Sequence, residues 1–374
     1  MITRIIERQI FNRLFKGKAI IIFGPRQSGK TTLINSIIAK RKEKCLLLNA
    51  DEPDIRDVLF NATSSRLRKF FGDNKIVIID EAQRVNDIGL TLKIITDNIK
   101  EIQLIATGSS SFELSNKTQE HLTGRKYEFL LLPLSFEEMV KHHSILEEKR
   151  LIEHRLIYGY YPEIVTKAGE EKELLKLLAT SYIYKDVLYL EQLSKPALLE
   201  KILKALAFQL GNEVSFYELA QLIGADKGTI EKYIDILEKA YVIFKLPAFN
   251  RNLRNEIKKS KKFYFYDLGL RNAIINNFNS IQNRNDIGAL WENFLISERY
   301  KYLNYNKIDA SIYFWRTPQH QEIDFIEERE GKLFAFEFKW NPKAKYHIPK
   351  TFKTNYPEST FKMISRDNFE NFIS

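Results

Sequence analysis

Residues 24–31 read Gly-Pro-Arg-Gln-Ser-Gly-Lys-Thr and determine how the first part of the chain folds. They match the pattern G-x-x-x-x-G-K-[ST], in which a glycine-bearing turn lets backbone N–H groups face a phosphate. An apolar run at 19–23 precedes them and a helical pattern at 32–38 follows. That order of strand, loop and helix favours a nucleotide site over the alternative, a glycine-bearing turn before an ordinary helix.

The loop predicts ATP and Mg²⁺ as cofactors. Lys30 is expected to reach the β- and γ-phosphates, and Thr31 to offer its hydroxyl to Mg²⁺. The helix that follows adds the positive end of its dipole. The residues expected to contact ATP are Gly24, Pro25, Arg26, Gln27, Ser28, Gly29, Lys30, Thr31, Thr32 and Ser109.

A second nucleotide signature is the apolar run at 76–79, which is closed by Asp80 and Glu81. An aspartate in this place can hold Mg²⁺ through its water shell. A glutamate one residue later can orient the attacking water and take its proton, so we assign Glu81 as the catalytic base. The alternative is that two acids simply end a strand.

Apolar runs alternate with helical patterns from 19 to about 107, which predicts a parallel sheet covered by helices. Ligands gather at the carboxyl ends of the strands in such sheets. Thr107 or Ser109, at the end of one run, can therefore hydrogen-bond the γ-phosphate or the water, unless these are only polar residues at a strand end. Arg125 follows in a polar loop and can stabilise phosphoryl charge, in its own subunit or from a neighbour in a homo-oligomer. The alternative is a surface arginine.

Composition limits the class of protein. The chain has 374 residues, enough for two or three domains, and a formal net charge of +10. That charge permits nucleic-acid binding without proving it. Cys45 is the only cysteine, which suits a reducing compartment, and no apolar run is long enough to span a membrane. We therefore expect a cytoplasmic protein without a membrane partner.

The segment 214–248 predicts a helix-turn-helix, with helices at 216–223 and 227–239 joined by a glycine turn. Two further strands look like a wing, and their connection, 251–262, holds six basic residues against one acid. Such a loop can follow a phosphate backbone, so DNA is the expected partner. The alternatives are a winged helix that binds protein and a basic hairpin tip that is merely solvated.

A second metal site is predicted near the end of the chain. Asp324 and Glu337 stand on expected neighbouring strands, and Lys339 shares the face of Glu337 because side chains alternate along a strand. Two carboxylates can hold Mg²⁺ while the lysine positions water for phosphodiester attack. Glu292, on a preceding helix, adds a third acid. This arrangement is that of restriction-endonuclease-like nucleases, although an E-x-K pattern alone also suits any exposed strand.

Several motifs together resemble a prokaryotic family of AAA-type ATPases whose C-terminal domain was long of unknown function. They are the loop at 24–31, Ile-Asp-Glu-Ala-Gln at 79–83, Thr-Gly-Ser-Ser-Ser at 107–111, Leu-Thr-Gly-Arg at 122–125 and Leu-Pro-Leu-Ser-Phe-Glu-Glu at 132–138. Gly-Tyr-Tyr-Pro-Glu at 159–163 departs from that family's usual pattern at Tyr160, where a glycine is usual. The resemblance implies an ATPase core, a winged helix and a nuclease-like C-terminal fold.

The expected fold class is α/β. It comprises a P-loop NTPase core at 1–145, a helical lid or connector at 146–211, a winged helix at 212–268 and a restriction-endonuclease-like domain at 269–374. The leading hypothesis is an ATPase that engages DNA and carries metal-dependent nuclease activity. The alternative is a nucleotide-driven switch or assembly module whose last two domains bind protein and are catalytically inactive.

Overall fold

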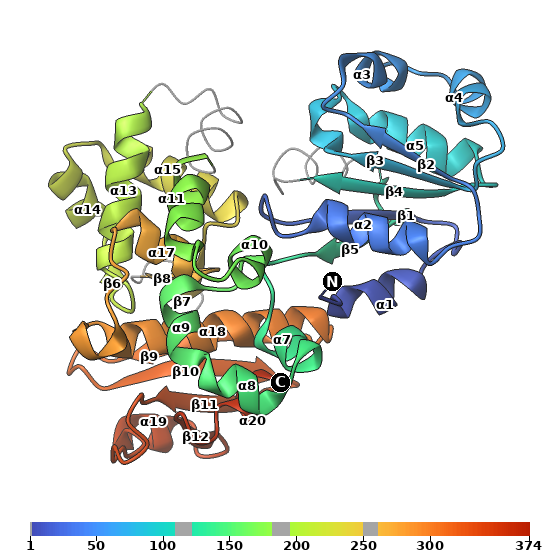
Figure 1. The fold of residues 1–374 in the computed structure, drawn as a ribbon. Coiled ribbons are helices and arrows are strands. Elements are labelled where there is room, and N and C mark those ends of the chain that lie inside the picture. Colours follow the sequence, from blue (N-terminus) through green and yellow to red (C-terminus); the bar gives the residue numbers. More distant parts are fainter. Residues whose placement is uncertain (1, 109–121, 182–194, 250–260) are drawn as a thin grey trace. The chain divides into compact units, whose positions relative to one another are not determined.

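The computed structural model describes residues 2–108, 122–181, 195–249 and 261–374 (Figure 1). The chain forms two compact units. The first comprises Met1–Leu134 with Lys239–Tyr241, and the second comprises Ser135–Glu238 with Val242–Ser374. The finer domain boundaries expected from the sequence stay predictions.

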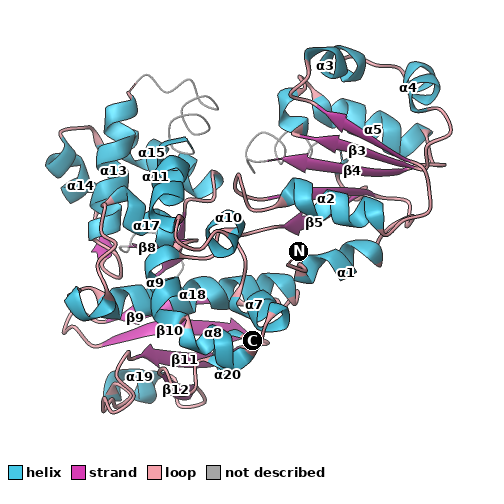
Figure 2. Cartoon of the chain, viewed as in Figure 1, coloured by secondary structure: helices cyan, strands magenta, loops and turns pink. Residues whose placement is uncertain are grey.

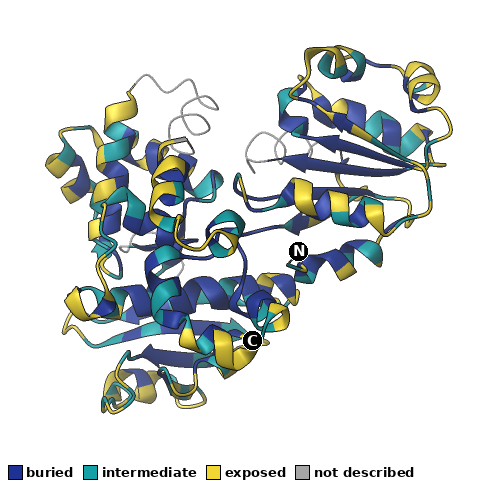
Figure 3. Cartoon of the chain, in the orientation of Figure 1, coloured by how far each residue is buried: buried dark blue, intermediate teal, exposed yellow. Residues whose placement is uncertain are grey.

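A five-stranded parallel sheet forms the centre of the first unit, in the order β2-β3-β4-β1-β5. Its strands are β1 (Ala19–Phe23), β2 (Cys45–Asn49), β3 (Ile76–Asp80), β4 (Gln103–Gly108) and β5 (Lys126–Leu130). This sheet confirms the predicted α/β class. The three inner strands β1, β3 and β4 are buried along their whole length, as Figure 3 shows in dark blue. Burial on both faces accounts for the apolar runs at 19–23, 76–79 and 104–106 within them.

Helices flank this sheet in Figure 2. They are α1 (Ile5–Phe11), α2 (Lys30–Ala39), α3 (Pro53–Leu59), α4 (Ser64–Phe71), the 3₁₀ turn η1 (Ala82–Arg84) and α5 (Ile88–Asn98). Leu92 and Ile95 of α5 and Leu67 of α4 join strand residues in one apolar core. That core fixes the carboxyl edge of the sheet, from which the loop at 24–31 projects.

The second unit begins with short helices and then contains a small antiparallel sheet of order β6-β8-β7. The helices are α7 (Phe136–His142), α8 (Ile145–Arg150), α9 (Ile152–Tyr158), α10 (Pro162–Thr166), α11 (Glu171–Ser181), α13 (Pro196–Phe208), α14 (Phe216–Ile223) and α15 (Lys227–Lys239). The strands are β6 (Glu213–Val214), β7 (Ile243–Pro247) and β8 (Lys261–Phe265). Gly224 ends α14 in a left-handed conformation, at the turn where the sequence predicted it.

A four-stranded sheet of order β12-β11-β10-β9 completes this unit. The remaining elements are α17 (Leu268–Ile274), η3 (Ile281–Asn283), α18 (Ile287–Tyr305), β9 (Ser311–Arg316), β10 (Glu322–Arg329), β11 (Lys332–Phe338), α19 (Lys350–Asn355), β12 (Thr360–Ile364) and α20 (Glu370–Ile373). The Phe249 N–H, two residues after β7, donates to the Phe314 carbonyl of β9 at 2.6 Å, so the chain that leaves the small sheet is hydrogen-bonded to this one.

The Gly-Tyr-Tyr-Pro-Glu motif has a structural role in the second unit. The buried Asp267 carboxylate caps α17 by accepting from Leu270 N at 3.0 Å, and it also accepts from Tyr160 N at 2.6 Å. Gly159 has a φ of 73°, and a Cβ there would lie 2.2 Å from Asp267 Oδ1. The motif therefore holds the end of α9 against the start of α17.

Candidate nucleotide and metal sites

The loop after β1 has the backbone of a phosphate cradle. Gly24 has a φ of 155°, and a Cβ there would lie 2.0 Å from the Leu131 carbonyl oxygen, so no larger residue fits. Gly29 has a φ of 94° and directly precedes the first residue of α2. Pro25 and Ser28 are buried in the turn, whereas Gln27, Thr31 and Thr32 are exposed and Arg26 is half-buried.

Arg4 supports the loop from within the first unit. Its Nη1 donates to the Ser28 carbonyl at 2.6 Å and its Nη2 to the Leu132 carbonyl at 2.5 Å. The side chain is buried, so these bonds fix the turn where it approaches the segment after β5. Sequence reasoning missed Arg4, because no motif marks a residue about 20 positions before the loop.

The two nucleotide signatures meet in the structure. Lys30 is buried, and its Nζ donates to the carbonyls of Gly24 at 2.9 Å and Pro25 at 2.8 Å. Thr31 Oγ1 donates to Asp80 Oδ2 at 2.9 Å. A hydroxyl and a carboxylate so placed are oxygen donors of the kind that Mg²⁺ prefers. The residues present therefore fit the predicted cofactor.

Thr107 joins this pair because β4 lies between β1 and β3. Its hydroxyl donates to Asp80 Oδ1, and the Glu81 N–H lies 3.3 Å from the same hydroxyl oxygen. Glu81 has a left-handed φ of 53°, and its carboxylate accepts a hydrogen bond from Gln83 Nε2. The sequence offered Thr107 or Ser109 for this position. The structure places Thr107 against Asp80, and Ser109 lies outside the described residues.

Arg125 is not brought to the loop within its own subunit. The Ala19 N–H donates to its carbonyl at 2.9 Å, which places Arg125 where β1 and β5 begin. The loop at 24–31 follows the opposite, carboxyl end of β1. Arg125 Nε instead donates to Asp97 Oδ1 at 2.7 Å, in a half-exposed ion pair.

The acids of the second predicted site do converge. Asp324 on β10 accepts a hydrogen bond from Phe338 N at 2.8 Å, and Glu337 Oε1 accepts one from Lys339 Nζ at 2.6 Å. Glu337 Oε2 is buried and makes no hydrogen bond within the described residues. Burial and the charges of Glu292 and Glu337 raise the pKa of Asp324 well above its ordinary value. Burial also raises the pKa of Glu337, against the opposing effect of Lys339.

These carboxylates suit a divalent cation by chemistry, and Oε2 of Glu337 offers a free donor atom. As they stand, however, no three His, Cys, Asp or Glu side chains within the described ranges form a ready-made metal cage. Glu292 also has a neighbour that the sequence did not reveal.

That neighbour is Lys262. Its Nζ lies 2.6 Å from Glu322 Oε1 and 3.1 Å from Glu292 Oε1, and the side chain is buried. Tyr264 OH donates to the same Glu292 oxygen at 2.5 Å. The prediction of a basic loop at 251–262 is wrong for Lys261 and Lys262, because β8 begins at Lys261. Residues 251–260 lie outside the described ranges.

Comparison with family models supports the first unit's nucleotide site. Residues 16–140 match a family described as an AAA domain, which supports an AAA-type, nucleotide-binding ATPase. Residues 149–281 and 287–371 match two models described as domains of unknown function (DUF8612 and DUF4143). None of the helices that the structure describes is long and apolar enough to cross a membrane.

Two relatives carry the description 'uncharacterized protein'. One from Mycobacterium tuberculosis is 26% identical over 330 residues, covering 87% of this chain and 71% of the relative. Another from Methanocaldococcus jannaschii is 24% identical over 351 residues, covering 88% and 76%. A structure of Drosophila ORC bound to AT-rich DNA and Cdc6 covers 72% of this chain and 90% of that chain, with 12% identity and a TM-score of 0.28. A likeness that weak carries no activity to this chain.

Proposed function

We propose that this chain hydrolyses ATP at the loop of residues 24–31 and uses the cycle to act on DNA. The observation that carries the first part is the hydrogen bond from Thr31 to Asp80, because it joins the two nucleotide signatures at one point. Bound Mg²⁺ would neutralise phosphate charge between these two side chains. When ATP binds, the Lys30 ammonium would give up its hydrogen bonds to the loop carbonyls and donate to phosphate oxygens, which are stronger acceptors because they are charged.

Glu81 is the proposed base. Its N–H donates to Asp80 Oδ1 at 3.2 Å and its carboxylate accepts a hydrogen bond from Gln83, so Glu81 adjoins the proposed metal site, and we assign it to take the proton of the attacking water. Arg125 lies where β1 and β5 begin, at the opposite end of the sheet from the loop at 24–31. Its proposed role is therefore to stabilise phosphoryl charge in a neighbouring subunit of a homo-oligomer.

The test is nucleotide binding and turnover in two variants. Lys30→Ala should abolish ATP binding, whereas Glu81→Gln should keep binding and lose about 10²–10⁴-fold in kcat, the usual contribution of a positioned base. Glu101→Gln, a glutamate that pairs with Arg68 on the surface, is the matched control and should behave as wild type. Normal turnover in Glu81→Gln would remove the assignment of the base.

DNA engagement is proposed through the helix-turn-helix and its wing. The order β6, α14, α15, β7, β8 suits a winged helix, and Lys227 and Lys232 are exposed on α15. We assign phosphate contacts to them and to the basic connection at 251–260. The C-terminal acids Asp324, Glu337 and Glu292 are the proposed metal ligands, and Lys339 would position the attacking water. The assay is ATPase activity with and without single-stranded and duplex DNA, beside nicking with Mg²⁺ or Mn²⁺.

A second candidate is a nucleotide-driven switch whose later domains bind protein. Two observations favour it. Lys262 already neutralises part of the acidic cluster, which is formed by Glu292, Glu322, Asp324 and Glu337. Phe208, Tyr217 and Leu222 are all more than 60% exposed on α13 and α14. ATPase activity that is indifferent to DNA, together with no nicking under either metal, would favour this candidate over the first.

A further inference from the structure

Lys262 is one of the least exposed lysines of the chain. The residue is 1% exposed, which for a lysine requires charged partners. Its Nζ has two carboxylates at ion-pair distance, Glu322 on β10 and Glu292 on α18, and its charge also acts on Asp324. The ammonium therefore stands among three acids that belong to, or border, the proposed metal site.

A lysine ammonium in this place neutralises carboxylate charge, as a bound metal ion would. Carboxylates that crowd together in a buried site repel one another, and either an ammonium or a divalent cation relieves that repulsion. The hydrogen bond from Tyr264 turns the same Glu292 oxygen toward Lys262. An oxygen of Glu292 that accepts from both Lys262 and Tyr264 is a poorer ligand for a metal ion.

We propose that Lys262 is a built-in counter-cation of the acidic cluster. The lysine holds Glu292 in an ion pair and competes with a divalent cation for that carboxylate. The proposal rests on the proposed metal-binding role of Asp324 and Glu337. It places control of that site on β8, the strand that directly follows the basic connection at 251–260.

Lys261 provides a matched control on the same strand. Adjacent strand residues point to opposite faces, and the Lys261 ammonium lies 5.6 Å over the Phe216 ring. The Lys262 ammonium lies instead against the acids. Replacing either lysine by methionine removes one positive charge from β8, but only Lys262→Met frees Glu292.

The experiment measures Mn²⁺ binding to the full chain by calorimetry, together with the Tm with and without Mn²⁺. Both variants and their reference carry Asp80→Asn, so that the nucleotide site does not contribute. Lys262→Met should bind Mn²⁺ at least about tenfold more tightly than the reference and gain more Tm from it. Lys261→Met should match the reference. Adding Glu337→Gln to Lys262→Met should remove the gain, which locates the ion.

Equal Mn²⁺ affinity in the reference and Lys262→Met would overturn the role of Lys262 and leave the metal site standing. Absence of Mn²⁺ binding in both would overturn the metal site as well, and with it this inference. If Lys262→Met does not fold, Lys262→Gln keeps a hydrogen-bond donor for Glu322, and the same comparison decides. ATP turnover with native Asp80 tests the other half of the proposed function separately.

Discussion

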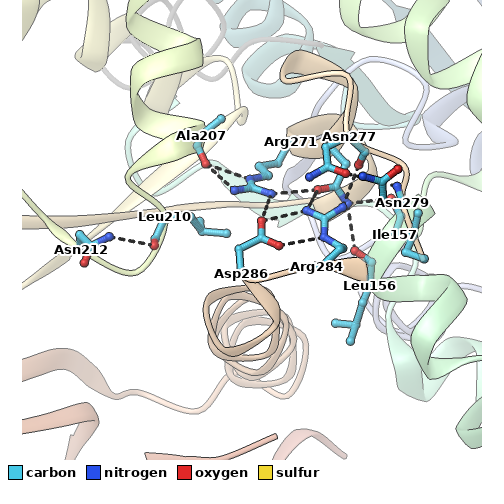
Figure 4. A network of polar contacts seen from close by, with 11 residues as sticks. Leu156, Ile157, Ala207, Leu210, Asn212, Arg271, Asn277, Asn279, Arg284 and Asp286 are labelled. Carbon is cyan, nitrogen blue, oxygen red and sulfur yellow. Dashed lines mark hydrogen bonds and ion pairs between the residues drawn. The ribbon is translucent and has the colours of Figure 1, made fainter. Parts of the chain in front are cut away.

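Two arginines converge on the Asp286 carboxylate, at the start of α18 (Figure 4). Arg271 also donates to the Ala207 carbonyl at 2.6 and 2.9 Å, and Arg284 donates to the Asn277 carbonyl at 2.8 Å. Burial alone would raise the pKa of Asp286, but the hydrogen bonds from Arg284 and Arg271 outweigh it and lower that pKa. The carboxylate is thus the shared partner of two buried cations.

We expect Asp286→Asn to lower the free energy of unfolding by about 2–4 kcal/mol at pH 7, because it leaves both arginines without a charged partner. A lowered pKa contributes stability above the ordinary carboxyl pKa of about 4, and that stability is lost as pH falls through the folded-state pKa. Because the folded-state pKa lies below this ordinary value, the gap in free energy of unfolding between variant and wild type should hold from pH 7 to about pH 5 and narrow mainly below about pH 4 in urea titrations. Asp309→Asn, at an exposed position, should show neither effect. A gap that stays constant with pH would contradict the ion-pair account.

Single residues are also where sequence reasoning reached its limit. Lys30, Thr31 and Asp80 could be assigned because local motifs set their geometry. Lys262 could not, because its partners Glu292 and Glu322 follow it by 30 and 60 positions, and only folding brings them together. A lysine in a basic stretch has the same pattern whether it faces solvent or a carboxylate.

At the scale of elements, the turn between α9 and α10 depends on Gly159. We expect Gly159→Ala to cost about 3 kcal/mol or more, because the new Cβ would meet both oxygens of the Asp267 carboxylate. Gly169→Ala is the matched control. Gly169 also has a positive φ, of 92°, but no atom lies within 4 Å of its Cβ position. It should cost only the backbone strain of about 1 kcal/mol. Equal losses in chemical denaturation would show that steric contact with Asp267 is not the cause.

The central strands of the parallel sheet were predicted closely, because strands buried on both faces are largely apolar. The run at 19–23 matches β1, and the run at 76–79 lies within β3. β5, at Lys126–Leu130, lies beyond the segment for which a parallel sheet was expected. The start of β8 was predicted less well. Lys261 and Lys262 were expected in the connection at 251–262, but β8 begins at Lys261, since a buried ion pair can substitute for an apolar side chain at a strand start.

At the scale of the whole molecule, strand order was beyond the sequence. Parallel strands follow one another along the chain, but β4 lies between β1 and β3 in the sheet. That position of β4 places Thr107 beside Asp80. Arg125 lies at the start of β5, which pairs in parallel with β1, and therefore at the end of the sheet opposite the loop. A local pattern gives the type of an element, whereas its neighbours depend on long-range packing.

Because the chain forms two compact units, we expect thermal unfolding in two transitions rather than one. ATP with Mg²⁺ should raise the midpoint temperature of only one transition, that of the unit that contains residues 24–31. A ligand stabilises the unit that binds it, by about 2.7 kcal/mol in free energy of unfolding at a hundred times its Kd. Differential scanning calorimetry measures both transitions. Limited proteolysis with and without ATP identifies which unit is protected.

Lys30→Ala is the control for this assignment, because it should remove the ATP-dependent shift and leave the other transition unchanged. A single transition that moves as a whole with ATP would mean that the two units unfold cooperatively. In that case, ATP binding at the loop would be energetically coupled to the unit that carries Lys262 and the acidic cluster. Two transitions of which only one responds to ATP would mean, by contrast, that the stability of the other unit does not depend on ATP binding.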